Sequence, residues 1–198
     1  MLSVWQILVE KGRRRHVVDI VVQWQPETVR LRIALIVAAL FCGMPAQAQF
    51  TLPPQLLDTA AGLLGQWIEA TRDDAVRQGV RPVPPKMYRA LVGYFPSSLL
   101  NGVRYGVGDS DAFSLPGLAF QYGDVAAITL GDVVLFRDQH VAETDVKLWA
   151  HELTHVQQFQ RWGTAGFAAH YVSDAAGVER EAYANADQFV AWQQRAQR

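Results

Sequence analysis

The spacing of hydrophobic residues divides the chain beyond residue 48 into helical and β-rich parts. After Pro53-Pro54, apolar side chains recur at steps of three and four residues, which is the period of an amphipathic helix. They are Leu56, Leu57, Ala60, Leu63, Leu64, Trp67 and Ile68. This pattern predicts a helix over residues 55–80, ended by Gly79 and the prolines that follow. A second, shorter helix is predicted to stop before Pro96.

The middle of the chain has the patterns of strands. Residues Val103–Val107 alternate, and the β-rich runs Val125–Thr129 and Val133–Phe136 are separated by a hairpin-like break at Leu130-Gly-Asp132. We therefore expect a short antiparallel sheet. Val133–Phe136 is either an ordinary strand or the edge that pairs with an extended peptide by strand addition.

Two further helices are predicted after the sheet. Thr144 and Asp145 offer a helix start, with a capping hydroxyl and an acid in the first turn. An apolar stripe at Val146, Trp149, Ala150, Leu153 and Val156 continues this helix to about Gly163. The last helix runs from about Ala176 toward Arg195. The order helix, helix, strands, helix, helix predicts an α+β domain.

The first 48 residues are predicted to lie outside this domain. Arg30 and Arg32 precede an apolar run of about ten residues, and Ala46-Gln47-Ala48 has the form of a cleavage site. The run is short of the ~20 residues that span a bilayer. We predict an upstream extension at 1–28, either non-native or unstructured, and a signal peptide at 29–48. A single exported domain follows at 49–198, periplasmic or extracellular, with no stable membrane span after cleavage.

The composition of the chain excludes several kinds of partner and of metal site. The 198 residues carry 18 basic and 19 acidic side chains and show no basic stripe, which argues against a nucleic-acid partner. The single cysteine, Cys42, excludes an internal disulfide and a cysteine-based zinc finger. Any metal must therefore be held by histidines and carboxylates.

The segment His151-Glu-Leu-Thr-His155 carries the strongest chemical signal. Residues four apart on a helix point the same way, so both imidazoles can reach one Zn²⁺ ion at about 2.0–2.1 Å. Glu152 would then hold the water on the zinc and take its proton, because zinc lowers the pKa of that water to about 7. No third histidine follows closely, so a carboxylate of the last helix, Glu179 or Glu181, is expected to complete the site.

The run His151-Glu-Leu-Thr-His-Val-Gln-Gln158, followed by Glu179-Arg-Glu-Ala182, resembles the gluzincin-type zinc metallopeptidases. In particular it resembles a bacterial zincin-like domain family whose hallmark is HELTHVxQ, and the likeness extends from about Val83 to Asp187. The resemblance implies a small zincin-like domain in which a glutamate-bearing helix follows the HExxH helix.

The resemblance also bears on the third ligand. In gluzincins this ligand begins an E-x-x-A-D pattern whose Asp orients a ligand histidine. The run Glu179-Arg-Glu-Ala182 matches the first four positions of this pattern, but Tyr183 stands in place of the Asp. The register that begins at Glu181 puts Asn185 there. Glu179 is preferred on this basis, and Glu181 stays open.

The function implied by the resemblance is hydrolysis of peptide bonds in a peptide or protein substrate. Glu152 is the expected general base. Tyr171, or alternatively His170, would stabilise the oxyanion, although ordinary packing would also explain either residue. The alternative function is a non-catalytic zinc-binding module, structural or docking, in the cell envelope or secretion machinery. The missing Asp at Tyr183 favours this alternative.

Overall fold

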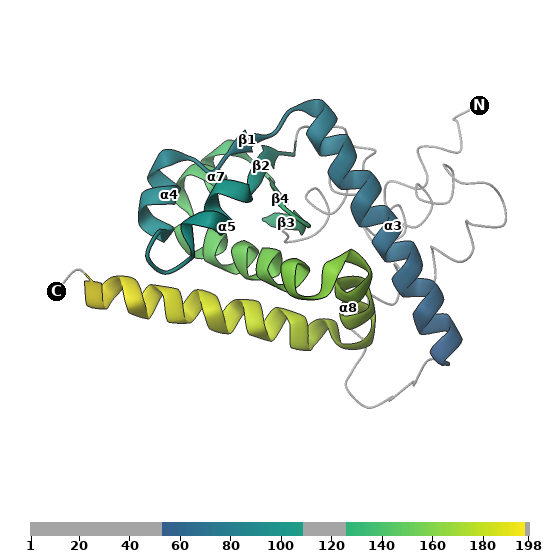
Figure 1. Ribbon diagram of the computed structural model, residues 1–198. Helices are drawn as coiled ribbons and strands as arrows, with labels where there is room; N and C mark the ends of the chain where they lie inside the picture. The colour runs from purple at the N-terminus through teal and green to yellow at the C-terminus, as the bar shows by residue number, and fades with distance from the viewer. Residues whose placement is uncertain (1–52, 109–125, 197–198) are drawn as a thin grey trace, which may run out of the picture. The chain divides into compact units, whose positions relative to one another are not determined.

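The computed structural model describes residues 53–108 and 126–196 (Figure 1). The predicted extension and signal peptide lie outside the described residues. In chain order the elements are α3 (Pro54–Gln78), β1 (Arg81–Pro82), α4 (Pro85–Leu91), α5 (Ser97–Gly102), β2 (Arg104–Val107), β3 (Ala127–Leu130), β4 (Val133–Phe136), α7 (Gln139–Thr144) and α8 (Val146–Ala196). The fold is α+β, as predicted.

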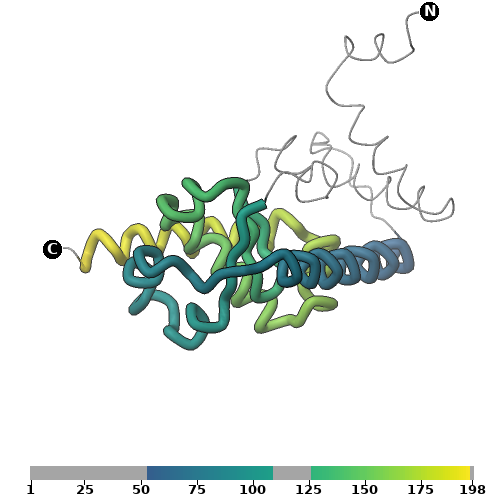
Figure 2. Tube along the Cα trace, turned by 90° about the horizontal axis from the view of Figure 1, so that it is seen from above, coloured from purple at the N-terminus to yellow at the C-terminus, as the bar shows by residue number. Residues whose placement is uncertain are grey.

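The long helix α3 begins and ends at residues suited to those places. Pro54 stands in its first turn, where a missing N–H costs nothing. Gly79 ends the helix with φ 105°, a conformation that side-chain-bearing residues rarely adopt. Ile68 and Ala75 of this helix are buried in one cluster with side chains of the sheet and α8. In the view from above, the tube of α3 lies over part of the strands and of α8 (Figure 2).

The sheet has four strands in the order β1-β2-β4-β3 and is mixed. β3 and β4 form the predicted antiparallel hairpin, turned at Gly131 with φ 69°. The prediction of a purely antiparallel sheet was wrong, because β2 pairs with β4 in parallel. Val133–Phe136 is also not an edge, since β4 is paired on both sides. Among the described strands, β1 and β3 are the two outer ones, and β3 is the one next to β4.

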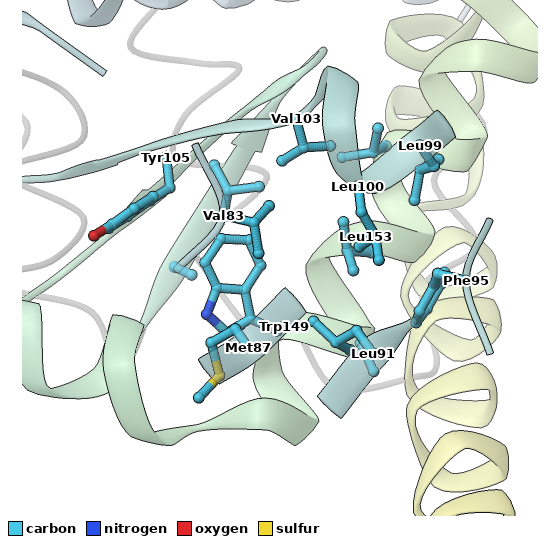
Figure 3. Packing of buried hydrophobic residues seen from close by; sticks show 14 of the residues in the cluster. Val83, Met87, Leu91, Phe95, Leu99, Leu100, Val103, Tyr105, Trp149 and Leu153 are labelled. Atoms are coloured by element: carbon cyan, nitrogen blue, oxygen red, sulfur yellow. The ribbon is translucent and has the colours of Figure 1, made fainter. Parts of the chain in front are cut away.

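Hydrophobic side chains cover both faces of the sheet. Along β4, Val134 and Phe136 join one buried cluster, while Val133 and Leu135 join another. Such alternation follows from the two-residue period of a strand. The first cluster contains Trp149 and Leu153 of α8, and Figure 3 shows them among the apolar side chains of α4, α5 and β2.

Helix α8 consists of three helical segments separated by two residues with non-helical angles. Gly163 has φ 67° and ψ 172°, and Asp174 has φ −151° and ψ 66°. The segments 146–162 and 175–196 run side by side in opposite directions (Figure 1). The middle segment, 164–173, packs back through Phe167, whose ring stacks on Phe159 at a centroid distance of 3.9 Å.

The start of α8 differs in one detail from the prediction. Thr144 is the last residue of α7, and its hydroxyl donates to the carbonyl oxygen of His140. The cap is Asp145, whose Oδ1 accepts from the backbone N–H of Leu148 at 2.8 Å. An aspartate at this place also interacts favourably with the helix dipole. Within 53–108 and 126–196, no helix is both long and apolar enough to cross a membrane.

Candidate metal centre

The two histidines of the HExxH motif lie side by side on the first segment of α8. His151 is 8% exposed and His155 is 6% exposed. Their Nε2 atoms are 3.1 Å apart. The segment is fixed by its buried neighbours Trp149, Leu153 and Val156, so the imidazoles project from a helix with a defined position.

Glu179 reaches the same point from the last segment. Its Oε2 is 3.3 Å from Nε2 of His151 and 3.6 Å from Nε2 of His155. Glu179 lies in the first turns after the break at Asp174, whose Oδ1 accepts from the backbone N–H of Gly177. The helical hairpin thus brings together residues that are more than twenty positions apart.

These three donor atoms fit a tetrahedral zinc site. Bonds of about 2.0–2.1 Å at the tetrahedral angle separate ligand atoms by about 3.3 Å. The separations of 3.1, 3.3 and 3.6 Å lie on either side of that value. In the part of the chain that the structure describes, no fourth His, Cys, Asp or Glu joins the group. Three protein ligands of this kind are typical of catalytic zinc sites, which keep one position open.

Glu179 and His155 shift each other's pKa values. Burial acts to raise the pKa of Glu179, but hydrogen bonds from His151 and His155 outweigh it and hold the pKa well below its usual range. Burial acts to lower the pKa of His155, but the hydrogen bond to Glu179 and the charges of Glu152 and Glu179 raise it overall. Both shifts favour positive charge next to the carboxylate of Glu179, which suits the binding of a cation.

Gln158 is hydrogen-bonded to the ring nitrogen of His155 that faces away from His151 and Glu179. Its Oε1 lies 2.8 Å from Nδ1 of His155, and its side chain is fully buried. Its Nε2 donates to the carbonyl oxygen of Val178 at 3.1 Å and to Oε2 of Glu181 at 3.0 Å. Gln158 belongs to the HELTHVxQ run, but no role was predicted for it from the sequence. Its spacing of three from His155 on a helix was the available signal.

Glu181, the other glutamate left open as a ligand, is placed away from the histidine pair. Its carboxylate accepts from Gln158 and, at 2.9 Å, from Nη2 of Arg161. Among the described residues it is Glu179 that groups with His151 and His155. Its hydrogen bond to Gln158 links it to the centre.

The surroundings of His151 differ from those of His155. Its Nδ1 is buried and has no hydrogen-bond partner among the described residues. The ring of Tyr183, which is 60% exposed, lies 4.4 Å from the ring of His151. Asn185 is bound elsewhere, to the hydroxyls of Tyr94 and Thr154. Neither residue therefore provides the hydrogen bond that the Asp of an E-x-x-A-D pattern would give.

Glu152 is held by the neighbouring strand. It is 4% exposed, and its Oε2 accepts from the hydroxyl of Thr129 at 2.6 Å. Thr129 belongs to β3, so the outer strand and the motif helix are tied together at the centre. Thr129 was not predicted from the sequence, because nothing local marks a strand residue as the partner of a glutamate 23 positions away.

The two candidates for oxyanion stabilisation have different positions. The hydroxyl of Tyr171 donates to Oε1 of Glu179 at 3.2 Å. Burial, followed by the charge of Glu179, raises the pKa of Tyr171 well above its usual value, so the hydroxyl stays a donor. His170 is exposed and its ring lies against Trp162 at 4.1 Å. Tyr171 is thus beside the centre and His170 is on the surface.

A shallow pocket of about 180 Å³ opens beside His151. It is lined by Leu148, Tyr183 and Ala186 and by the charged residues Asp145 and Lys147. At least one histidine of the centre therefore borders a space that solvent or a ligand can enter.

Comparison with known proteins gives one match. Residues 114–163 match the family described as the eCIS core domain. The matched part includes β3, β4, α7 and the first segment of α8, with the whole HExxH motif. The match spans 50 of the 198 residues, and the name of the family refers to extracellular contractile injection systems. Neither the curated proteins nor the solved structures gave a match.

Proposed function

We propose that the chain is an exported zinc-dependent metallopeptidase that hydrolyses peptide bonds. The observation that carries the proposal is the triangle of His151, His155 and Glu179, whose donor atoms have tetrahedral separations. The buried carboxylate of Glu152, next to the first ligand, supports a hydrolytic rather than a purely structural site.

The residues have distinct roles in this proposal. A zinc ion held by His151, His155 and Glu179 would supply Lewis acidity to water and to the substrate carbonyl. Glu152, oriented by Thr129, would accept a proton from the attacking water while the water oxygen bonds to the carbonyl carbon. When the C–N bond breaks, the same proton would pass to the leaving amine. Tyr171 would turn its hydroxyl from Oε1 of Glu179 to the developing oxyanion and donate its hydrogen bond there.

The family match supports a setting for this activity. Because residues 114–163 match the eCIS core domain, we propose that the substrate is a protein or peptide met outside the cytoplasm, in connection with a contractile injection system. The short apolar run before Ala48 supports export in the same way.

The alternative function is a non-catalytic zinc-binding module of that machinery. Two observations favour it: Tyr183 stands in place of the orienting Asp, and Nδ1 of His151 lacks a partner among the described residues. An ion held in this way would join the two long segments of α8 and so stabilise the fold.

A peptide library separates the two functions. The purified full chain would be assayed for bound zinc by elemental analysis and then incubated with a proteome-derived peptide mixture, with cleavage read by mass spectrometry. We expect one equivalent of zinc and cleavage that Glu152→Gln abolishes while zinc is retained. Glu69→Gln, an exposed carboxylate on α3, is the matched control.

The other outcomes are equally informative. Zinc without cleavage in the wild-type chain would favour the structural module. Cleavage that survives Glu152→Gln would overturn the mechanism, and the absence of zinc after reconstitution would overturn the metal centre itself.

A further inference from the structure

The hydrogen bonds around Gln158 fix which nitrogen of His155 faces the centre. The Nε2 group of Gln158 is directed at a backbone carbonyl and a carboxylate, at 3.1 and 3.0 Å. Both are pure acceptors in their usual states. If the amide were turned over, its oxygen would face these two acceptors. The network therefore assigns Nε2 to that side and Oε1 to His155.

The orientation of the amide determines the tautomer of the histidine. Because Oε1 of Gln158 can only accept, Nδ1 of His155 must carry the hydrogen of the 2.8 Å bond. In the neutral ring Nε2 is then the atom with the free lone pair. That atom is the one that lies 3.1 Å from His151 and 3.6 Å from Glu179.

The support extends beyond Gln158. Glu181 holds the amide and is itself held by Arg161, whose side chain is half exposed. The chain Arg161, Glu181, Gln158, His155 thus runs from the surface to the centre through three hydrogen bonds. His151 has no such support among the described residues.

We infer that Gln158 is a positioning residue for the metal centre, and that Glu181 acts on the centre through it by locking the amide. The inference rests on the proposed zinc site but not on catalysis. Glu181 then holds the amide of Gln158 and does not bind the metal itself. Partners of this kind orient ligand histidines in many metal sites, and their loss typically costs about 10- to 100-fold in metal affinity.

The test is zinc affinity of the full chain, measured by competition with a chromophoric chelator. Gln158→Met keeps the length of the side chain and removes the hydrogen bonds, so affinity should fall roughly 10- to 100-fold. Gln157→Met is the matched control: it changes the neighbouring, half-buried glutamine, and affinity should stay unchanged. Glu181→Ala changes a more exposed residue and should lower zinc affinity roughly three- to tenfold. It tests the chain of hydrogen bonds if the Gln158→Met protein does not fold.

A paired exchange distinguishes positioning from packing. Gln158→Glu combined with Glu181→Gln keeps an acceptor for His155 and a donor between the two positions, but it loses the hydrogen bond to the carbonyl oxygen of Val178. Zinc affinity should therefore recover part of the loss seen in Gln158→Met, by about threefold or more. As a spectroscopic signature, the zinc-loaded wild type should show a slowly exchanging Nδ1–H proton of His155 in NMR, lost in Gln158→Met.

The outcomes separate this inference from the proposed function. Wild-type chain without zinc overturns both. Wild-type chain that binds zinc, with unchanged affinity in Gln158→Met and Glu181→Ala, overturns the positioning role alone. A thousandfold loss in Glu181→Ala that the paired exchange fails to rescue would instead make Glu181 a ligand.

Discussion

The first and last segments of α8 contribute to one centre from different surroundings. In segment 146–162, every residue from Trp149 to Val156 is buried. In segment 175–196, burial follows a single stripe formed by Val178, Ala182, Ala186 and Phe189. The first is a core helix and the second is an amphipathic helix lying on it.

This difference indicates how the centre is built. A helix enclosed on all sides has its position dictated by packing, so His151 and His155 are preset by the core. Glu179 is brought to them by one apolar stripe and by the breaks at Gly163 and Asp174. The third donor is thus held by fewer buried neighbours on its own helix than the first two.

Removal of a donor should have the largest effect on metal binding. We expect His155→Ala and Glu179→Ala each to weaken zinc binding by roughly a thousandfold, because each removes one of three ligands. Without metal, both changes should lower the Tm, because His155→Ala leaves a void in the core and Glu179→Ala removes the carboxylate that pairs with both histidines and with Tyr171. Chelator competition and thermal unfolding of the metal-free chain measure both effects. Tight binding by Glu179→Ala would show that the assignment of the third ligand is wrong.

Truncation of apolar side chains tests the same contrast in stability. Leu153→Ala, fully buried beside the centre, should lower the free energy of unfolding by about 2–5 kcal/mol. Val190→Ala, half-buried on the last segment, should cost about 1 kcal/mol or less. Urea titration measures both. Equal losses would contradict the view that the last segment only lies on the core.

Substitution of Thr129 by valine should affect the reaction and not the metal. The change removes the 2.6 Å hydrogen bond to Glu152 and keeps the shape of the side chain. Loss of a hydrogen bond to a charged group is worth about 1.5–3 kcal/mol, so cleavage should slow by about tenfold or more. Thr154→Val is the control, since its hydroxyl contacts Ala150 and Asn185 instead. A loss of zinc in Thr129→Val would argue against this separation.

The smallest effect is expected from an ion pair outside both segments. Arg72 of α3 donates to Asp132 in the β3–β4 turn at 2.6 Å, and this hydrogen bond holds the pKa of Asp132 below its usual value despite partial burial. A depressed carboxyl pKa stabilises the fold at neutral pH, and this contribution is lost as the pH falls through the folded-state pKa. Because both partners are partly exposed, we expect less than about 1 kcal/mol. Asp132→Asn should flatten the acid limb of the stability curve; an unchanged curve would show that the pair contributes nothing.

Local periodicity accounts for the parts of the fold that could be predicted. The apolar steps along α3 and the stripe around Leu153 define helices whatever their partners. Strand alternation, however, says nothing about which strand lies beside which, so the parallel pairing of β2 with β4 was not foreseen. Of the two alternatives for Val133–Phe136, the edge strand was wrong for the same reason.

The centre was predictable as far as one helix could specify it. His151, Glu152 and His155 follow from spacing alone. Glu179 and Glu181 are two residues apart and so project from different sides of their helix. Which of them faces the histidines depends on how the returning segment packs, and this is a property of tertiary structure. The partners Gln158 and Thr129 depend on the same packing.

The mixed sheet has a consequence for the order in which the chain folds. The turn at Gly131 closes β3 onto β4 over two residues, and such hairpins form in about 1–10 μs. Pairing of β2 with β4 must first close a longer loop, which costs entropy before it gains contacts. We therefore expect Val134→Ala to slow folding and Arg104→Ala mainly to speed unfolding, as stopped-flow kinetics would reveal. In that order of events, Thr129 would be in place to receive Glu152 before the sheet is complete.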